Sequence, residues 1–450
     1  MFNRKEWLKQ ANIIADVLDQ APEVDRNYRL PPEEFIARQK NVMQMLRENG
    51  ADCGIVYSNE HYCGDVPYLA GNNNIIVEPI AAVLGKEGLF FIAGLESGIV
   101  AEQLCHRSGV KIKKVDIHKI DEPDYSTDLL RPEQIIDMAC GGKPKNIALL
   151  TSKYVLPVGL HNVLSSYIGN ENILNLSKEY CEIKYEKSDN EMKLIDEACK
   201  MSDIIIEGML SVLKPGMFET QLAQWGYCMA MELGSEDLGF PIMVTANKSN
   251  MTMVGRAMNN MIQEGDIVHI GVSPKRDGLC GAQRVSVVCT DDPGKIPAQT
   301  KMWFEFLEGA FQYSLEKFRE IAHNKLEGCE HEKAMIEYYR NNAPMYLKKA
   351  GISVPDFALQ KGYVSTHNSG YTECQEFFGA CDLGFTRPLG RQIVTMIDVG
   401  LKGYGDDWSE CIIPGLDYIV IEKTIGKFGN DVRVLNNLPI NLQKFVGRGF

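Results

Sequence analysis

The chain has 450 residues, of which 45% are hydrophobic and 24% charged, and its formal net charge is −13. This length favours two domains over one, and the composition is that of an ordinary globular protein. The acidic balance argues against a general role in binding nucleic acid or anionic membranes.

Cysteine usage and hydropathy bear on where the protein works. No apolar run approaches the about 20 residues that span a bilayer, and the first residues lack the continuous apolar stretch of a secretory signal. The 13 cysteines are scattered singly, without a CxxC pair, which is typical of reduced and mostly buried thiols. We therefore expect a cytoplasmic protein with no membrane partner.

The first part of the chain predicts an arm followed by an α/β domain. Residues 1–34 have a helical pattern and then a polar, proline-containing linker. From residue 35 a helical pattern runs to Gly50, a residue suited to the end of a helix. Short apolar runs then alternate with helical patterns, which predicts an N-terminal domain over residues 35–178 with a largely parallel or mixed sheet. The absence of a glycine-rich phosphate loop argues against a nucleotide site in it.

The pattern changes in residues 185–450. Ser188 and Glu191 fit a capping box at the start of a long amphipathic helix that stops at the KPG sequence of residues 214–216. A second helix, strands, two more helices and further strands follow in that order. This order predicts an α+β domain built from two similar halves.

Two stretches of this second domain hold the candidate chemistry. Residues 264–288 predict a β-hairpin, because two β-rich runs flank an Asp277-Gly278 pair that suits a tight turn. Residues 366–378 place His367 beside a bend rich in Gly and Ser, where its side chain can face a cleft.

Carboxylate and imidazole side chains are numerous in the second domain, and a dinuclear hydrolytic metal site needs about four or five of them. The candidates are Asp266, His269, Asp277, His367, Glu373, Glu376, Asp398, Asp406, Asp407 and Glu410. Several have simpler interpretations as turn, strand-entry or solvated-loop residues. His269 alternates with apolar neighbours, so it faces either the core or the cleft, whereas His367 is better placed for function. Cys280 and Cys374 are more simply small buried residues than nucleophiles.

Six stretches together resemble the creatinase and aminopeptidase P superfamily, which has the pita-bread fold. They are GADCGIVYSNEHYCGDVPYLAG in the first domain, and IKYEKSDNEMKLIDEACKMSDIIIEGMLSVLKPGMFETQLA, GRAMNNMIQEGDIVHIGV, THNSGYTEC, QIVTMIDVG and RVLNNLPINL in the second. The resemblance covers residues 35–450. It implies a ribonuclease-H-like N-terminal domain of the creatinase type and a pita-bread C-terminal domain, in a homodimer that acts on a small molecule or a short peptide.

Metallopeptidases of this superfamily bind two metal ions through two Asp, one His and two Glu side chains. Projected onto this chain, the two Asp positions fall on Gly271 and Ala282, which have no donor side chains. The His falls on His367, the first Glu on Asp398 and the last Glu on Glu410. The resemblance thus implies degenerate ligand positions. We expect no metal cofactor, or at most a weakly held divalent ion such as Mn, Zn, Co or Fe.

Other positions of the resemblance bear on catalysis and substrate binding. The substrate-gating His falls on Val254, and the second His of the histidine loop falls on Cys374. Creatinase works without metal, but its histidine base also corresponds to Val254, so proton transfer would come from His367 or from His269 turned into the cleft. Arg284 lies close to the position at which creatinase places a glutamate for its cationic substrate, and an Arg there would favour a carboxylate or phosphate on the ligand. An alternative interpretation of equal weight is that Arg284 corresponds to the usual strand arginine of the superfamily, displaced by one residue.

Three functional hypotheses follow. The first is a hydrolase without a dinuclear metal centre that cleaves a C–N bond of a small substrate, with His367, Asp398 and Glu410 as a polar wall and Arg284 as anchor for an anionic group. The second is a metal-dependent Xaa-Pro aminopeptidase or dipeptidase. The third is a non-catalytic ligand-binding homologue, which the residues at Val254 and the metal positions would allow.

Overall fold

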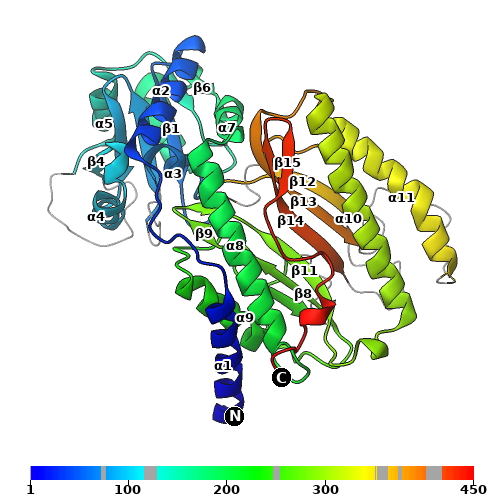
Figure 1. Cartoon of the computed structure of the whole chain (residues 1–450). Coiled ribbons are helices and arrows are strands. Elements are labelled where there is room, and N and C mark those ends of the chain that lie inside the picture. The colour runs from blue at the N-terminus through cyan, green and yellow to red at the C-terminus, as the bar shows by residue number, and fades with distance from the viewer. Residues whose placement is uncertain are drawn as a thin grey trace. The chain divides into compact units, whose positions relative to one another are not determined.

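The computed structural model describes residues 2–71, 78–115, 129–246, 254–349, 351, 363–372, 378–401 and 418–450. The chain divides into two compact units (Figure 1). The larger unit comprises Met1–Tyr28, Lys187–Ser369 and Gly379–Phe450, and the smaller unit comprises Arg29–Glu186 and Gly370–Phe378.

The smaller unit is an α/β domain with a mixed sheet, as the sequence predicts. Its strands are β1 (Cys53–Ser58), β2 (Ile80–Gly85), β3 (Gly88–Ala93), β4 (Lys111–Lys114), β5 (Ile147–Leu149) and β6 (Ile173–Asn175), in the sheet order β4-β3-β2-β1-β5-β6. Its helices are α2 (Pro32–Glu48), α3 (Asp65–Ala70), α4 (Leu95–Leu104), α5 (Pro132–Cys140), α6 (Val158–Ile168) and α7 (Ser177–Tyr185). The pairs β1–β2 and β2–β3 are antiparallel and the other three are parallel.

The larger unit is built on one antiparallel sheet. Its described strands are β7 (Met243–Ala246), β8 (Ile267–Val272), β11 (Gln283–Val288), β12 (Tyr363–Asn368), β13 (Gln392–Leu401), β14 (Ile419–Phe428) and β15 (Asp431–Val434). They follow the order β12-β13-β14-β11-β8-β7, with β15 paired to β14. Strands far apart in the sequence are therefore neighbours at the centre of the sheet, where β14 pairs with β11.

The predicted hairpin of residues 264–288 is confirmed. Strand β8 pairs with β11 in antiparallel register, and between them β9 (Lys275–Arg276) and β10 (Leu279–Cys280) form a tight two-stranded turn. Asp277 and Gly278 have φ angles of 47° and 84°. Positive φ at both central residues is what a tight hairpin turn requires, and an Asp-Gly pair adopts it readily.

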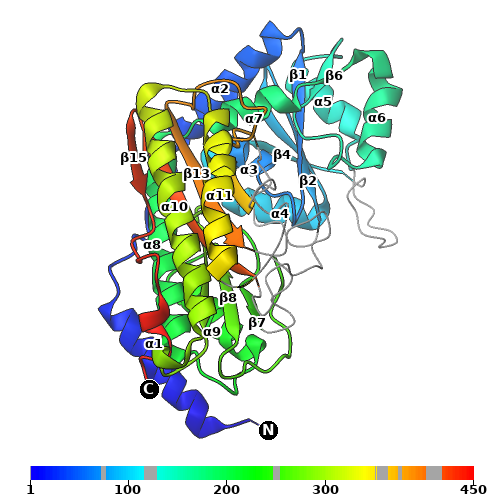
Figure 2. The ribbon, with the colours of Figure 1, turned by 90° about the vertical axis from the view of Figure 1, so that its right-hand side faces the viewer.

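Helices complete the larger unit. They are α1 (Arg4–Gln20), α8 (Asp189–Val212), α9 (Glu219–Glu232), α10 (Ala298–Asn324) and α11 (Cys329–Lys349). The predicted capping box is present at α8, because the Ser188 hydroxyl accepts from the Glu191 N–H and the Glu191 carboxylate accepts from the Ser188 N–H. The long helices α10 and α11 pack side by side (Figure 2). The predicted order of helix pair, strands, helix pair and strands is confirmed.

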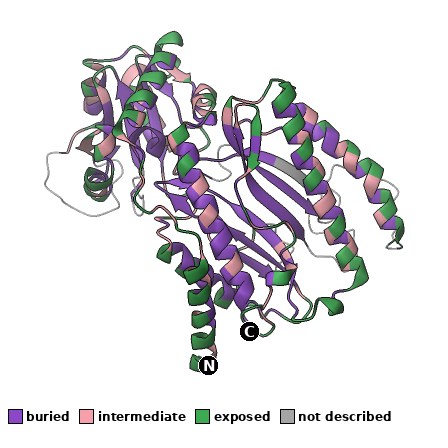
Figure 3. Cartoon of the chain, in the orientation of Figure 1, coloured by how far each residue is buried: buried purple, intermediate pink, exposed green. Residues whose placement is uncertain are grey.

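One face of the large sheet packs against helices. Val285 and Val287 of β11 belong to a hydrophobic core with residues of α8 and α9, and α10 contacts β13 and β14. Because successive side chains of a strand point to opposite faces, Arg284 and Ser286 point to the other face. Both faces of the central strands are buried (Figure 3). Among the described residues, none of the helices combines the length and hydropathy that crossing a bilayer requires.

Candidate active site

Ionisable side chains from four adjacent strands meet on the face of the large sheet that lies opposite the helices. Asp398 of β13 is directly opposite Glu422 of β14, which is opposite Arg284 of β11, which is opposite Gly271 of β8. Directly opposed residues of antiparallel strands project from the same face. His367 comes from the outer strand β12, two positions along from the residue opposite Asp398.

An arginine joins the two carboxylates. Arg284 donates from Nε to the Oε2 atom of Glu422 and from Nη2 to the Oδ2 atom of Asp398. The Nε2 atom of His367 lies 3.4 Å from the Oε1 atom of Glu422. The side chains of Asp398 and Glu422 are 0% exposed, and those of His367 and Arg284 are 5% and 6% exposed. The four side chains form one buried ion network, which we call the Arg284 network.

Electrostatics within this network keep Glu422 ionised. Burial alone would raise the pKa of the Glu422 carboxyl, but the charge of Arg284 and the nearby His367 outweigh burial and lower that pKa. Tyr418, which lies just before β14 and is also buried, has its phenol pKa raised by burial. Glu422 is therefore a charged hydrogen-bond acceptor that can orient an imidazole.

Gly271 and Ala282, where the resemblance places the first two metal ligands, offer no donor side chains. A Cβ atom at Gly271 would meet the Cγ atom of Arg284 at 3.0 Å and the Sδ atom of Met243 at 3.2 Å. Ala282 donates its N–H to the Oγ1 atom of Thr424 at 3.0 Å, and that hydroxyl donates back to the Ala282 carbonyl at 2.8 Å. Both positions are thus small and closely packed.

His269 faces the same side of the sheet but is set apart from the Arg284 network. It is fully buried, its Nδ1 atom lies 3.4 Å from the Thr245 hydroxyl, and its ring packs edge-on against Tyr418 at 5.4 Å. Its Nε2 atom has no hydrogen-bond partner within the described part of the chain. Burial and then the charge of Arg284 lower the pKa of His269 to about 3, so the ring is neutral. These contacts fit a structural role for His269, in which only its Nδ1 atom forms a hydrogen bond.

The remaining predicted site residues lie elsewhere or outside the described ranges. Val254 is 68% exposed. Glu410 and Cys374 lie outside the described residues. Asp266 accepts from the N–H of Gln263 at 2.7 Å, as a strand-entry residue would.

Glu422 is the residue that sequence reasoning missed. The sequence predicts strands in this last part of the chain, but the carboxylate of β14 is not among the candidate residues that it indicates. A usable signal exists, because Glu422 is the one carboxylate of β14 and directly follows three apolar residues at the start of that strand. Such a residue must find partners when the strand is central and buried.

The residues that the structure describes do not by themselves fit a dinuclear metal centre. The donor atoms of His367, Asp398 and Glu422 lie within 4.8 Å of one another, so the described residues offer three ligands for one ion. Arg284 ion-pairs with both carboxylates, and a cation would have to displace it. The two positions that would add carboxylates are Gly271 and Ala282.

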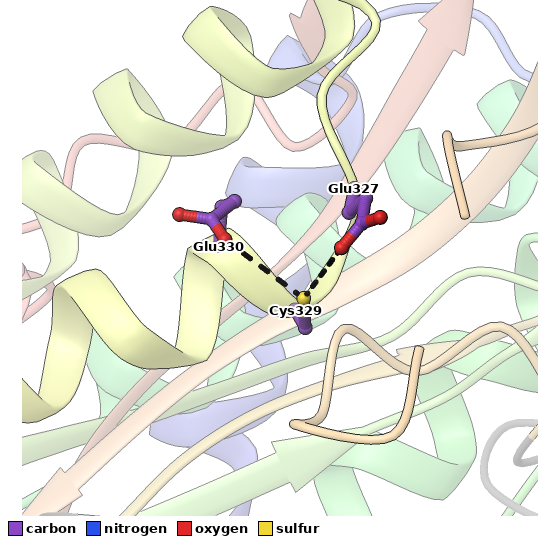
Figure 4. Close-up of side chains that lie close together, drawn as sticks. All are labelled: Glu327, Cys329 and Glu330. Atoms are coloured by element: carbon purple, nitrogen blue, oxygen red, sulfur yellow. Dashed lines mark hydrogen bonds between the residues drawn. The ribbon is translucent and has the colours of Figure 1, made fainter. Parts of the chain in front are cut away.

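A second group of possible ligands lies at the start of α11 (Figure 4). The Cys329 thiol donates to Glu327 at 3.5 Å and to Glu330 at 4.0 Å. Lys333 forms an ion pair with Glu330 at 2.7 Å. These contacts around the start of α11 explain the cluster without a ligand.

Comparison with known proteins shows that the chain is similar in sequence to peptidases. Residues 193–372 match the model of metallopeptidase family M24. This stretch includes the positions of Gly271, Arg284 and His367 and ends before Asp398 and Glu422. The chain is 24% identical over 253 residues to the putative dipeptidase YkvY of Bacillus subtilis, and 23% identical over 122 residues to the uncharacterized peptidase YqhT of the same organism. These matches span only 63% and 35% of the lengths of those relatives.

Solved structures resemble nearly the whole chain. The X-Pro aminopeptidase of Thermotoga maritima has a TM-score of 0.68 at 16% identity, over 90% of this chain and 99% of that one. The dipeptidase PepE of Mycobacterium ulcerans has a TM-score of 0.67 at 16% identity, over 92% and 99%. The chain therefore has the two-domain fold of these peptidases, with a creatinase-type N-terminal domain and a pita-bread C-terminal domain, and its residues 193–372 resemble metallopeptidase family M24.

Proposed function

We propose that the protein is a hydrolase that cleaves a C–N bond of a small amide or short peptide without a dinuclear metal centre. The observation that carries the proposal is the buried pair of His367 and Glu422 inside the Arg284 network. The choice of a C–N bond is supported by the aminopeptidases and dipeptidases among the proteins of similar structure.

His367 is the proton-transfer group in this proposal. It accepts a proton from a water molecule as the water oxygen attacks the carbonyl carbon, and it returns that proton to the leaving nitrogen when the C–N bond breaks. Glu422 stabilises the imidazolium that exists between these two steps. Arg284 and Asp398 hold Glu422 in place through the shared guanidinium. No step of this scheme passes through a metal ion.

The charge of the Arg284 network bears on the substrate. Its two carboxylates exceed its one guanidinium by one negative charge when His367 is neutral. Arg284, which the sequence suggested as an anchor for an anionic group, already donates to both carboxylates. This arrangement supports a substrate with a protonated amine more than one with a free carboxylate at this point.

A metal-dependent Xaa-Pro peptidase is the second candidate. It is favoured by the three donor atoms within 4.8 Å at His367, Asp398 and Glu422 and by the match to family M24. Elemental analysis separates the two candidates, because a metallopeptidase would retain Mn, Co, Fe or Zn in stoichiometric amounts.

Turnover of a substrate panel tests the proposal. Wild type, His367→Ala and Glu422→Gln would be assayed with small amides, proline dipeptides and guanidino acids. We expect kcat to fall about 100-fold or more in His367→Ala, the range in which general acid–base groups contribute. His323→Ala is the matched control, because His323 is an exposed histidine of the same unit and its loss should leave kcat unchanged.

Turnover that is unaffected by His367→Ala would show that His367 is not the base. Binding of panel compounds without any turnover would favour the non-catalytic homologue instead. We further propose a cytoplasmic homodimer, for which the mass in solution should be twice the 50.4 kDa of one chain.

A further inference from the structure

We propose that Arg284 takes the electrostatic place of the metal ions, with Gly271 providing the space for its side chain. This inference rests on the proposed metal-independent function. It goes beyond that function because it assigns the exclusion of metal to one residue pair, Arg284 and Gly271.

Burial creates the need for a positive charge at this point. Asp398 and Glu422 are 0% exposed and stand directly opposite each other on β13 and β14. Two ionised carboxylates in such a place are strongly unfavourable without a cation. The planar guanidinium of Arg284 donates to both of them from two different nitrogen atoms. One side chain therefore supplies the positive charge that these two buried carboxylates require.

The absence of a side chain at Gly271 leaves room for the side chain of Arg284. Arg284 is directly opposite Gly271 in the β8–β11 pair. A Cβ atom at Gly271 would lie 3.0 Å from Cγ and 3.3 Å from Cδ of Arg284, and 3.2 Å from Sδ of Met243. Even an alanine would press on the arginine, and an aspartate would need more room still. The loss of a carboxylate at position 271 and the presence of Arg284 are thus complementary.

Metal titration of purified protein tests the role of Arg284. Mn²⁺ binding and the melting temperature would be measured for wild type and Arg284→Ala. We expect Mn²⁺ to leave the melting temperature of wild type unchanged. We expect Arg284→Ala to melt at a lower temperature, to bind Mn²⁺ at least tenfold more tightly than wild type, and to recover thermal stability when Mn²⁺ is added.

Arg276→Ala is the matched control. Arg276 is also a fully buried arginine and forms an ion pair with Glu236. Its loss should lower the melting temperature without creating a response to Mn²⁺. If Arg284→Ala gains no more Mn²⁺ affinity than Arg276→Ala, or if wild type itself binds two ions per chain, the proposal is wrong.

A charge-cancelled variant keeps the test decisive if Arg284→Ala does not fold. The combination Arg284→Ala, Asp398→Asn and Glu422→Gln removes the arginine together with both negative charges. We expect it to fold even if Arg284→Ala does not, to melt at a higher temperature than Arg284→Ala if both fold, and not to respond to Mn²⁺. A triple variant that is no more stable than the single variant would overturn the electrostatic role.

Substitution of Gly271 tests the steric half of the pair. Gly271→Ala should lower the melting temperature of wild type, and it should lower that of the Arg284→Ala background less. Equal effects in both backgrounds would show that Gly271 does not serve Arg284. These readouts are metal binding and stability, so they can fail while turnover by His367 stands, and the reverse also holds.

Discussion

At the scale of single residues, Glu422 is the centre of the candidate site. Its two oxygen atoms serve Arg284 and His367, and its strand lies between those that carry Arg284 and Asp398. A carboxylate in this position has two tasks, because it fixes the imidazole and it neutralises the guanidinium. Removing it should therefore affect folding as well as catalysis.

We predict that Glu422→Gln lowers the free energy of unfolding by about 1.5–3 kcal/mol, the range for a lost hydrogen bond to a charged group, because Arg284 keeps Asp398 as its remaining carboxylate partner. Urea denaturation measures it. Glu207→Gln is the matched control, because Glu207 pairs with Arg448 near the surface and the two side chains are 29% and 40% exposed. Its loss should cost less than about 1 kcal/mol. Equal losses in the two variants would show that the Arg284 network contributes no more than a surface pair.

At the scale of elements, the site depends on how closely the hairpin approaches α8. Gly281 follows β10, and a Cβ atom there would lie 2.6 Å from the Cys199 sulfur and 2.7 Å from the Cys199 backbone nitrogen. A helix backbone cannot yield as a flexible side chain can. The hairpin that carries Gly271 and Arg284 is therefore held at a fixed distance from the helix.

We predict that Gly281→Ala destabilises the protein by about 1–3 kcal/mol through overpacking. Gly159→Ala serves as its control, since Gly159 lies in α6 with no other atom within 4 Å of the added Cβ. That change should be neutral or stabilising by up to about 1 kcal/mol through helix propensity. Thermal unfolding of both variants checks the difference, and a harmless Gly281→Ala would contradict the close approach.

The α10–α11 pair contains a pH-sensitive contact. His331 of α11 is buried, its Nε2 atom lies 2.8 Å from the Ser314 hydroxyl of α10, and burial lowers its pKa from 6.5 to about 4. The unfolded chain binds the proton more readily, so stability is complete above pH 6.5 and is lost as pH falls toward 4.

We predict that between these values wild type loses about 1.4 kcal/mol per pH unit more than His331→Gln does. Urea unfolding at a series of pH values measures the two slopes. Parallel slopes would mean that His331 does not remain neutral in the folded protein.

Local features of the fold could be predicted from the sequence, but the pairing of charges could not. The Ser188 capping box and the Asp277-Gly278 turn depend on residues close together in the chain, and both are confirmed. Arg284 and Glu422 are 138 positions apart, and their contact depends on strand order and register. A charged residue in a buried strand signals that a partner exists, without saying which residue it is.

At the scale of the whole molecule, the fold of known peptidases is combined with a site in which the Arg284 guanidinium supplies the positive charge. The fold over most of the chain resembles peptidases of known structure, while Gly271 and Arg284 change the electrostatics of the central sheet. The central claim is that this site works without a dinuclear metal centre.

Elemental analysis of the wild-type protein tests this claim most directly. The protein would be produced in medium supplemented with Mn, Co, Fe and Zn, purified without chelators and measured by mass spectrometry together with its turnover. We predict well below one divalent ion per chain and turnover that survives added chelator. Two tightly held ions per chain, with turnover lost on chelation, would contradict the account.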